Sequence, residues 1–485
     1  MKSSTPPDYT PQPIAPSVNG GHVLLVNSMA MWIAAFMTTS INIALPSIQT
    51  ELHLGAVALG WLPLAYILCT AVFLVPFGKI ADLFGRRLVY LAGLTVFSLS
   101  SLALVFANSY LPLVGFRAGQ GMGGAMMFAG STAMITLAFP PERRGRAMGI
   151  NVAIVYLGQT MGPIVGGVIV YNIGWRSLFL VAGCYGLLNL SLDFWLLRRA
   201  EWKEEGAAGF DWAGSLAYAV SLSAFLLGLS WLPEPRGVIL AVAGIAGLGL
   251  FVWWETRARA PVVEVRLFRH NRVFAFSNMA ALISYAALWA MSFLMSLYLQ
   301  FIKGLNAQTA GLVLIAGVAL QASMSPLAGR LSDRVQPRWV ASGGMALCVV
   351  GLLSFSFLQT ATPYWRIVAT LCVLGIGYAF FSTPNQSSIM GSVERRYVGV
   401  ASASLGTMRM IGQAISIGVA TLVLAAIVGR HDIRPADYPN LLTAVRITFA
   451  VMTVLCVVGV AASLARGTLA ARGGPAELAS PTAEL

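Results

Sequence analysis

Charged side chains are scarce in this sequence. Only 10% of its 485 residues are Asp, Glu, Lys or Arg, whereas a soluble domain carries about 25%. Hydrophobic residues make up 57% of the chain, and the mean hydropathy is +0.76. This composition excludes an ordinary soluble protein and indicates an integral membrane protein.

Paired cysteines are also absent. Cys69, Cys184, Cys348, Cys372 and Cys456 all lie in apolar runs, and none belongs to a CxxC pair. This usage predicts neither a disulfide framework nor a metal site. No stretch combines a nucleophile, a base and an orienting group, so we expect no enzyme activity and no cofactor.

The alternating ten-residue segments of a transmembrane barrel are missing too, whereas long apolar runs are abundant. Fourteen runs are long enough to cross a bilayer, which takes about 20 residues. They are centred near Ala34, Tyr66, Phe97, Met126, Leu157, Leu187, Ser221, Gly247, Leu288, Val318, Val349, Gly377, Ala414 and Leu455. The predicted fold class is therefore an all-α membrane protein with fourteen transmembrane helices.

The net charge of +13 is distributed unevenly along the chain. Most Lys and Arg residues fall in loops after even-numbered runs, and we assign only Arg236, Lys303, Arg430 and Arg434 to the opposite loops. The positive-inside rule then puts both termini in the cytoplasm of a cell-membrane protein. The basic loops would face an anionic inner leaflet, so we expect no nucleic-acid partner.

An internal repeat divides the chain. The loop "PFGKIADLFGRR" recurs as "PLAGRLSDRVQPR", with Gly78 and Gly329 251 positions apart. At about 30 residues a helix, this distance fits two six-helix bundles, residues 22–200 and 273–466, around an inserted helix pair and cytoplasmic connector, residues 201–272. Residues 1–21 and 467–485 are expected to be disordered tails without a signal peptide. Duplicated halves with a central site are typical of secondary transporters.

The run "GQTMGPIVGG" combines small residues at helical spacing with a proline. The residues are Gly158, Gly162, Pro163, Gly166 and Gly167. Small residues four apart allow helices to pack closely, and proline kinks a helix. Tight packing alone would explain this run as well as a role in transport.

Two arginines lie inside apolar runs, where charge usually marks a pathway or a buried partner. Arg117 is about two turns from the end of its run, so its side chain could also snorkel to the surface. Arg409 lies about 13 Å into its run by helix rise, which favours a cavity role or a pairing between bundles. Asp82, next to basic residues in the repeated loop, can pair across a helix junction.

Together these motifs resemble the major facilitator superfamily, and more narrowly its fourteen-helix drug/proton antiporter family. "GKIADLFGRR" matches the superfamily loop motif, "RAGQGMGGA" the fourth-helix motif, and "GQTMGPIVGG" the antiporter motif of the fifth helix. "NIALP", "FDWAGSLAY", "PVVEVRLF" and "RMIG" suggest the fourteen-helix branch. The resemblance covers residues 22 to 466.

The resemblance implies a monomer whose two bundles rock around a central cavity and export small organic compounds in exchange for protons. It also implies a latch at the cytoplasmic side. Its residues would be Gly78, Asp82, Gly85, Arg86 and Arg87, with Gly329 and Asp333 in the repeat.

The first apolar run departs from the family pattern. Drug exporters of this branch commonly carry an Asp five residues before the Asn of "N-x-A-L-P", and here Met37 occupies that position. Asp193 is the one acid within a span. We therefore predict Asp193 as the proton carrier, with Arg117 tuning a neighbour's proton affinity; an ion pair of Asp193 with Arg198 or Arg199 is the alternative, as is transport without proton coupling.

The substrate site is predicted to be neutral to positive and rich in hydrogen-bonding groups. Its candidate residues are Thr39, Asn42, Tyr66, Gln120, Gln159, Asn385, Gln386 and Arg409. Such a cavity favours a polar-aromatic or anionic solute. A drug exporter is the leading hypothesis; the alternatives are a transporter of one metabolite, such as a vitamin, siderophore, organic anion or lysolipid, and a membrane receptor that does not transport.

Overall fold

The computed structural model describes residues 19–198, 211–232, 234–258, 265–394 and 398–467. The two predicted tails lie almost wholly outside these ranges, as does Arg199 and the side chain of Asp333. Fourteen helices in the described ranges are long and apolar enough to cross a membrane, which agrees with the number of apolar runs. Helices dominate because a chain in lipid must satisfy its backbone hydrogen bonds internally.

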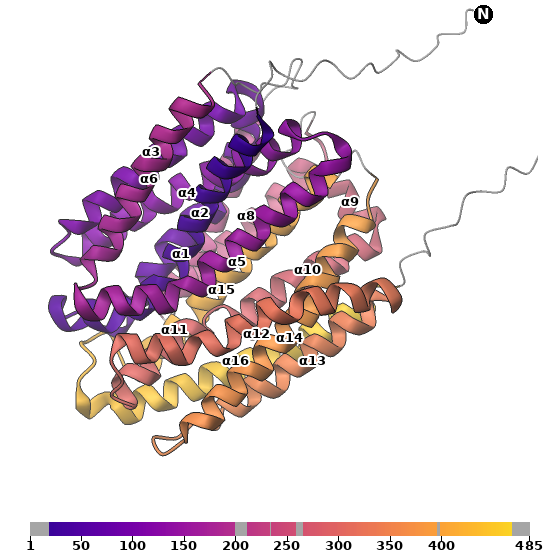
Figure 1. The fold of residues 1–485 in the computed structure, drawn as a ribbon. Helices are drawn as coiled ribbons and strands as arrows, with labels where there is room; N and C mark the ends of the chain where they lie inside the picture. The colour runs from indigo at the N-terminus through magenta and orange to yellow at the C-terminus, as the bar shows by residue number, and fades with distance from the viewer. Residues whose placement is uncertain (1–18, 199–210, 233, 259–264, 395–397, 468–485) are drawn as a thin grey trace, which may run out of the picture.

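The helices form two bundles joined by an inserted pair (Figure 1). The N-terminal bundle comprises α1 (Gly20–Leu52), α2 (Ala56–Phe84), α3 (Arg86–Val105), α4 (Tyr110–Ala138), α5 (Pro141–Asn172) and α6 (Arg176–Leu196). The inserted pair is α7 (Trp212–Trp231) and α8 (Pro235–Glu255), followed by the short α9 (Val265–His270). The C-terminal bundle comprises α10 (Arg272–Leu288) with α11 (Met291–Leu297) and the π-turn η1 (Tyr298–Ile302), α12 (Ala307–Arg334), α13 (Pro337–Phe355), α14 (Tyr364–Gly391), α15 (Val398–Ile427) and, after the 3-10 turn η3 (Pro435–Asp437), α16 (Tyr438–Ala465).

We call the end of the molecule where α1 begins the N face, and the end where α1 finishes the far face. Helix α9 lies at the N face as well (Figure 1). The inserted pair lies at the seam between the bundles: the Tyr218 hydroxyl of α7 donates to the carbonyl of Ala71 in α2 at 3.1 Å. Leu229 of α7 covers Gly418 in α15.

The repeat is visible in how glycines bring neighbouring helices together. Gly93 of α3 and Gly123 of α4 face each other so closely that a Cβ on Gly93 would lie 2.8 Å from the Gly123 carbonyl oxygen. Gly344 of α13 and Gly377 of α14 repeat this contact, at 2.6 Å. Gly93 and Gly344 are separated by the same 251 positions as Gly78 and Gly329. Small residues let helix backbones approach, which is how helices associate in lipid.

Candidate functional site

The two bundles meet through α1 and α11 in the far-face half of the molecule. The Asn42 side chain donates to the Ser292 hydroxyl at 3.4 Å, and the Ser296 hydroxyl donates to the Asn42 carbonyl at 2.5 Å. Gln300 donates to the carbonyl of Ile43 at 3.2 Å. Nearer the far face, Gln49 reaches the carbonyl of Ile433 at 3.5 Å. These hydrogen bonds join the two bundles in the far-face half.

Helices α5 and α12 also join the two bundles in the far-face half, and glycines let their backbones touch directly. A Cβ on Gly311 of α12 would lie 2.0 Å from the carbonyl oxygen of Pro163 in α5. One turn further along α5, a Cβ on Gly167 would lie 2.7 Å from the carbonyl oxygen of Ala307. The far-face half is therefore closed by backbone contacts between the bundles.

Arg409 of α15 lies between the bundles. Its guanidinium carbon is 5.7 Å from the centroid of the Phe128 ring in α4 of the opposite bundle. The side chain is half-buried, and its buried Nε has no hydrogen-bond partner. Among the described residues, no carboxylate forms an ion pair with Arg409, so a positive charge in a partly desolvated place is left without a counter-charge.

Tyrosines from four other helices surround this arginine. Tyr66 of α2, Tyr156 of α5 and Tyr378 of α14 all lie within electrostatic range of Arg409. Tyr285 of α10 packs edge-on against Tyr378, with ring centroids 6.0 Å apart. We call Tyr66, Phe128, Tyr156, Tyr285, Tyr378 and Arg409 the Arg409 cluster.

The cluster has the chemistry of a site for a flat or anionic group. Its rings can stack on an aromatic solute, its hydroxyls can bond a polar one, and its guanidinium can pair with an anion in bidentate geometry. Tyr66 and Arg409 were predicted as site residues. The sequence did not predict the other four residues, Phe128, Tyr156, Tyr285 and Tyr378, because an aromatic residue in a membrane span is ordinary. Only their depth within the spans could have indicated a binding site.

Other predicted binding residues have partners within one bundle. Gln120 accepts a hydrogen bond from Arg117 and donates to the Ser101 hydroxyl at 2.7 Å. Asn385 donates to the carbonyl of Ser277 in α10 at 3.0 Å. The Gln386 side chain is exposed. The contacts of Gln120 and Asn385 hold neighbouring helices of one bundle together, whereas the residues of the Arg409 cluster come from both bundles.

The remaining predicted binding residues are Thr39 and Asn42 of α1 and Gln159 of α5. The Thr39 hydroxyl is within 3.1 Å of the Gln159 carbonyl, which joins α1 to α5. Both side chains are half-buried, whereas the Asn42 side chain is buried with an unpartnered oxygen. These polar residues therefore serve helix contacts in this arrangement, and the Asn42 oxygen has unused hydrogen-bonding capacity.

Arg117 is buried in α4, so its side chain does not snorkel to the surface. It is 1% exposed, donates to the Leu62 carbonyl at 3.0 Å, and lies 4.7 Å from the centroid of the Tyr66 ring. Through Tyr66 it connects the interior of the N-terminal bundle with the Arg409 cluster.

Asp193 is fully buried near the N-face end of α6. Its carboxylate lies 2.6 Å from Nη2 of Arg87, the second residue of α3. The sequence favours Arg198 or Arg199 as the partner, whereas the structure brings in Arg87 because α3 packs beside α6. Arg198 is exposed. An arginine of the predicted latch and the predicted proton carrier thus form one buried ion pair.

The rest of the latch loop is built around Gly85. Its φ of 116° lies in a region that residues with a Cβ rarely adopt, and it lets α2 end and α3 begin without an intervening loop. Asp82 pairs with Arg86 at 2.9 Å across this junction. A Cβ on Gly78 would meet nothing within 4 Å, and one on Gly329 would make only an ordinary contact with Thr383.

The glycines of "GQTMGPIVGG" have two different partners. A Cβ on Gly158, Gly162 or Gly166 would collide with α1, at 2.6, 1.9 and 2.7 Å respectively. Gly167 and the carbonyl of Pro163 instead face α12 across the bundles. The motif therefore provides tight packing within the N-terminal bundle and, one turn later, the far-face contact between bundles.

Comparison with known proteins gives one consistent result. The family model described as "Major Facilitator Superfamily" matches residues 28–417 and, again, residues 305–478. The multidrug resistance protein Stp of Mycobacterium tuberculosis is 32% identical over 410 residues, which is 83% of this chain and 75% of Stp. The riboflavin transporter RibZ of Clostridioides difficile is 26% identical over 396 residues, 81% of this chain and 86% of RibZ.

A solved structure has the same fold. It is a bacterial homolog of the human lysosomal transporter Spinster, in an inward-facing and unoccupied conformation. The TM-score is 0.67 with 16% sequence identity, and the match covers 93% of this chain and 98% of the other. At this identity the likeness concerns the fold alone.

Proposed function

Because the chain belongs to the major facilitator superfamily, we propose that it exports small organic molecules by alternating access, with the Arg409 cluster as its central site. The unpaired charge of Arg409 between the two bundles carries this proposal. A group placed there is contacted by both bundles, so its binding responds to their relative movement. The 32% identity to a multidrug resistance protein supports export of drug-like compounds.

The preferred substrates are anionic or polar-aromatic compounds. The cluster offers a guanidinium and five aromatic rings, and the described spans place no carboxylate beside it. A bound dication would be repelled by Arg409 and would find no carboxylate beside it to neutralise its charge. Met37 stands where drug exporters of this branch commonly carry an acid. We therefore propose that dicationic drugs are poor substrates.

Arg409→Gln is expected to weaken binding of an anionic aromatic substrate by about ten- to a hundredfold, the cost of losing a charge-assisted hydrogen bond. A panel of anionic, neutral and cationic aromatic compounds would first be screened by uptake into inside-out vesicles. Affinities of the best anionic compound would then be measured on purified protein.

Arg446→Gln is the matched control, because Arg446 is an exposed arginine of α16 in the C-terminal bundle. It should leave the affinity unchanged. A folded Arg409→Gln variant that binds like the parent, or a parent that transports only dications, would overturn the proposed site.

The N face is proposed to face the cytoplasm of a cell-membrane protein, since the basic loops gather there. Closure of the far face then makes this arrangement inward-facing. In a background without native cysteines, Arg269→Cys in α9 should react with an impermeant maleimide only after cells are opened. Ala361→Cys, exposed between α13 and α14, should react on intact cells. The reverse pattern would invert the orientation.

We also propose that export is coupled to protons through the Arg87–Asp193 pair. A carrier must take up and release a proton during the cycle, and Asp193 can do so if its partner moves. Arg87 lies two residues after Gly85, so movement at the junction of α2 and α3 would separate the two charges. The separated carboxylate, desolvated and without its counter-charge, would then bind a proton.

A transporter dedicated to one metabolite is the second candidate. The acid-free α1 and the aromatic cluster suit a flat heterocyclic compound, and the related RibZ is a riboflavin transporter. A substrate panel distinguishes the two candidates: several unrelated aromatic compounds should be exported by a drug exporter, and a single one by a dedicated transporter.

A further inference from the structure

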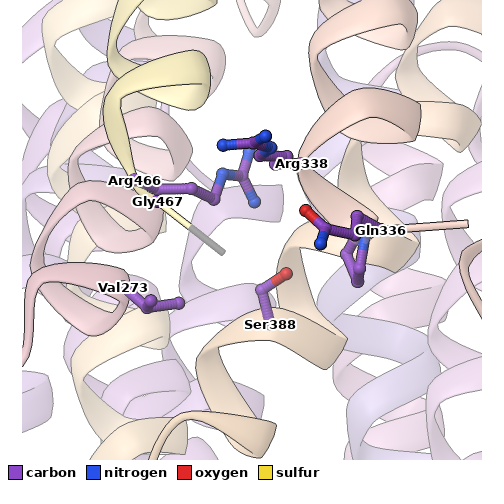
Figure 2. Close-up of a pocket in the computed structure, with 7 residues that line it drawn as sticks. Val273, Gln336, Arg338, Ser388, Arg466 and Gly467 are labelled. Carbon is purple, nitrogen blue, oxygen red and sulfur yellow. The ribbon is translucent and has the colours of Figure 1, made fainter. Parts of the chain in front are cut away.

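The N-face end of the C-terminal bundle has a pocket whose charged lining consists of arginines. Arg338 from the first turn of α13 and Arg466 just past α16 both line it, with Gln336, Ser388 and Val273 (Figure 2). The cavity itself is small, with a volume of about 10 Å³, roughly the room of one water molecule. It can therefore take one small polar atom, such as a single oxygen of a group whose remainder stays at the open mouth.

Hydrogen bonds fix the position of the Arg466 guanidinium, but one of its nitrogens has no partner. Its side chain is 1% exposed, and its Nε donates to the Ser463 carbonyl at 2.8 Å. Nη2 bonds the Ser463 hydroxyl, which also accepts from Ser342 at 2.8 Å. Nη1 is buried and has no partner. One donor edge of a rigidly positioned guanidinium therefore remains available.

Arg338 adds a second unsatisfied guanidinium. Its Nε is buried and without a hydrogen-bond partner. In the part of the chain that the structure describes, neither Arg338 nor Arg466 forms an ion pair. Burial lowers the pKa of Arg466 to about 10, so it stays protonated at neutral pH. Arg466 is buried and Arg338 is half-buried, and two like charges lining one pocket are costly unless an anion joins them.

In the N-terminal bundle, the arginine at the equivalent position is neutralised by a carboxylate of the same bundle, that of Asp193. Arg87 lies six residues before Gly93, and Arg338 six before the equivalent Gly344. Within α6 and α16, Gly186 and Gly459 pack against α3 and α13 respectively. The residue seven positions later is Asp193 near the end of α6 and Arg466 just past the end of α16.

The C-terminal bundle thus has a second arginine, Arg466, at the position that the carboxylate of Asp193 occupies in the N-terminal bundle. The N-terminus of α13 adds positive potential at the pocket, since α13 begins at Pro337 and its N-cap residue Gln336 makes no side-chain cap; the C-terminus of α16 beside Arg466 contributes the opposite sign. The free N–H groups and the dipole of a helix N-terminus attract anions.

We propose that this pocket binds a phosphoryl group, supplied by an anionic lipid headgroup or by a soluble phosphate. A phosphoryl group presents several acceptor oxygens to the forks of two guanidiniums, whereas one carboxylate has two. The pocket opens where α13 begins and α16 ends, at the level where headgroups meet the protein. The site is separate from the Arg409 cluster and does not depend on the transported substrate.

The first experiment measures binding to the purified, delipidated full-length chain. In one arm, inorganic phosphate is titrated and the thermal unfolding midpoint is followed. In the other, equal amounts of phosphatidylglycerol and phosphatidylcholine are added, and native mass spectrometry counts how many molecules of each the protein retains. Saturable phosphate binding without retained phosphatidylglycerol identifies a soluble ligand, and the reverse identifies a lipid. If the parent shows neither, the proposal is wrong.

The variants assign the binding to the pocket. The double variant Arg338→Gln with Arg466→Gln should lower the affinity for the ligand that the parent binds, phosphate or phosphatidylglycerol, by at least about ten- to a hundredfold. The control Arg269→Gln, an exposed arginine at the same face, should bind like the parent. Arg466→Asp supplies the acid found in the other bundle, so it should stay folded and lose binding. Unchanged binding in a folded Arg466→Asp variant would overturn the proposal.

Discussion

Gly311→Val is expected to abolish transport while leaving the protein folded. A Cβ at this position would lie 2.0 Å from a backbone oxygen of α5, so the bundles must separate in the far-face half. Overpacking of this kind costs about 1–3 kcal/mol or more, enough to shift a two-state equilibrium about five- to a hundredfold. Transport should fall by at least about tenfold, because the far face no longer closes.

The matched control is Gly343→Val, since a Cβ at Gly343 in α13 would meet nothing within 4 Å. Both substitutions place the same side chain inside a helix, so only the contact differs. Ser292→Cys, in a background without native cysteines, reports the change directly: a reagent added at the far face should label it in Gly311→Val and not in the parent. Equal transport and labelling in the two glycine variants would show that the α5–α12 contact does not gate the far face.

Gly162→Val should behave differently from Gly311→Val, because its clash is with Thr39 and Ser40 of the same bundle. That clash would lower stability and would not hold the far face open. The comparison separates packing within a bundle from contact between bundles.

Asp193→Asn is expected to destabilise the protein by about 3–5 kcal/mol, the usual cost of removing one partner of a buried ion pair. Arg87, which is 7% exposed, would keep its charge near a neutral, fully buried amide. Replacing both residues, as in Arg87→Leu with Asp193→Leu, should recover much of this loss because no buried charge remains. The free energy of unfolding in detergent, measured for both single variants and the double variant, gives the coupling of the pair.

The same variants test the coupling to protons. In proteoliposomes with an imposed pH gradient, the parent should move substrate uphill. Asp193→Asn, assayed below its unfolding temperature, should only equilibrate it. Uphill transport by the folded double variant would show that the pair is structural and that protons take another route. A parent that ignores the pH gradient would exclude proton coupling altogether.

The sequence by itself determined the fourteen helices and the two related halves. Lipid offers the backbone no hydrogen bonds, so each long apolar run has to be a helix whatever its neighbours are. The loop repeat at Gly78 and Gly329 was equally clear, because a motif recurring at a fixed distance needs no knowledge of contacts. Arg409 could be placed at depth by counting residues along one helix.

Only the tertiary structure decided which residues meet. The Arg409 cluster takes one side chain from each of six helices, and nothing in any single run marks Tyr156, Tyr285 or Tyr378 as neighbours. Arg87 and Asp193 are 106 positions apart, and their pairing depends on α3 lying beside α6. The pocket of Arg338 and Arg466 likewise depends on α13 lying beside α16. Periodicity and motifs report the environment along one helix, whereas a binding site depends on how helices distant in sequence pack, and that is set by the shapes of their contact surfaces.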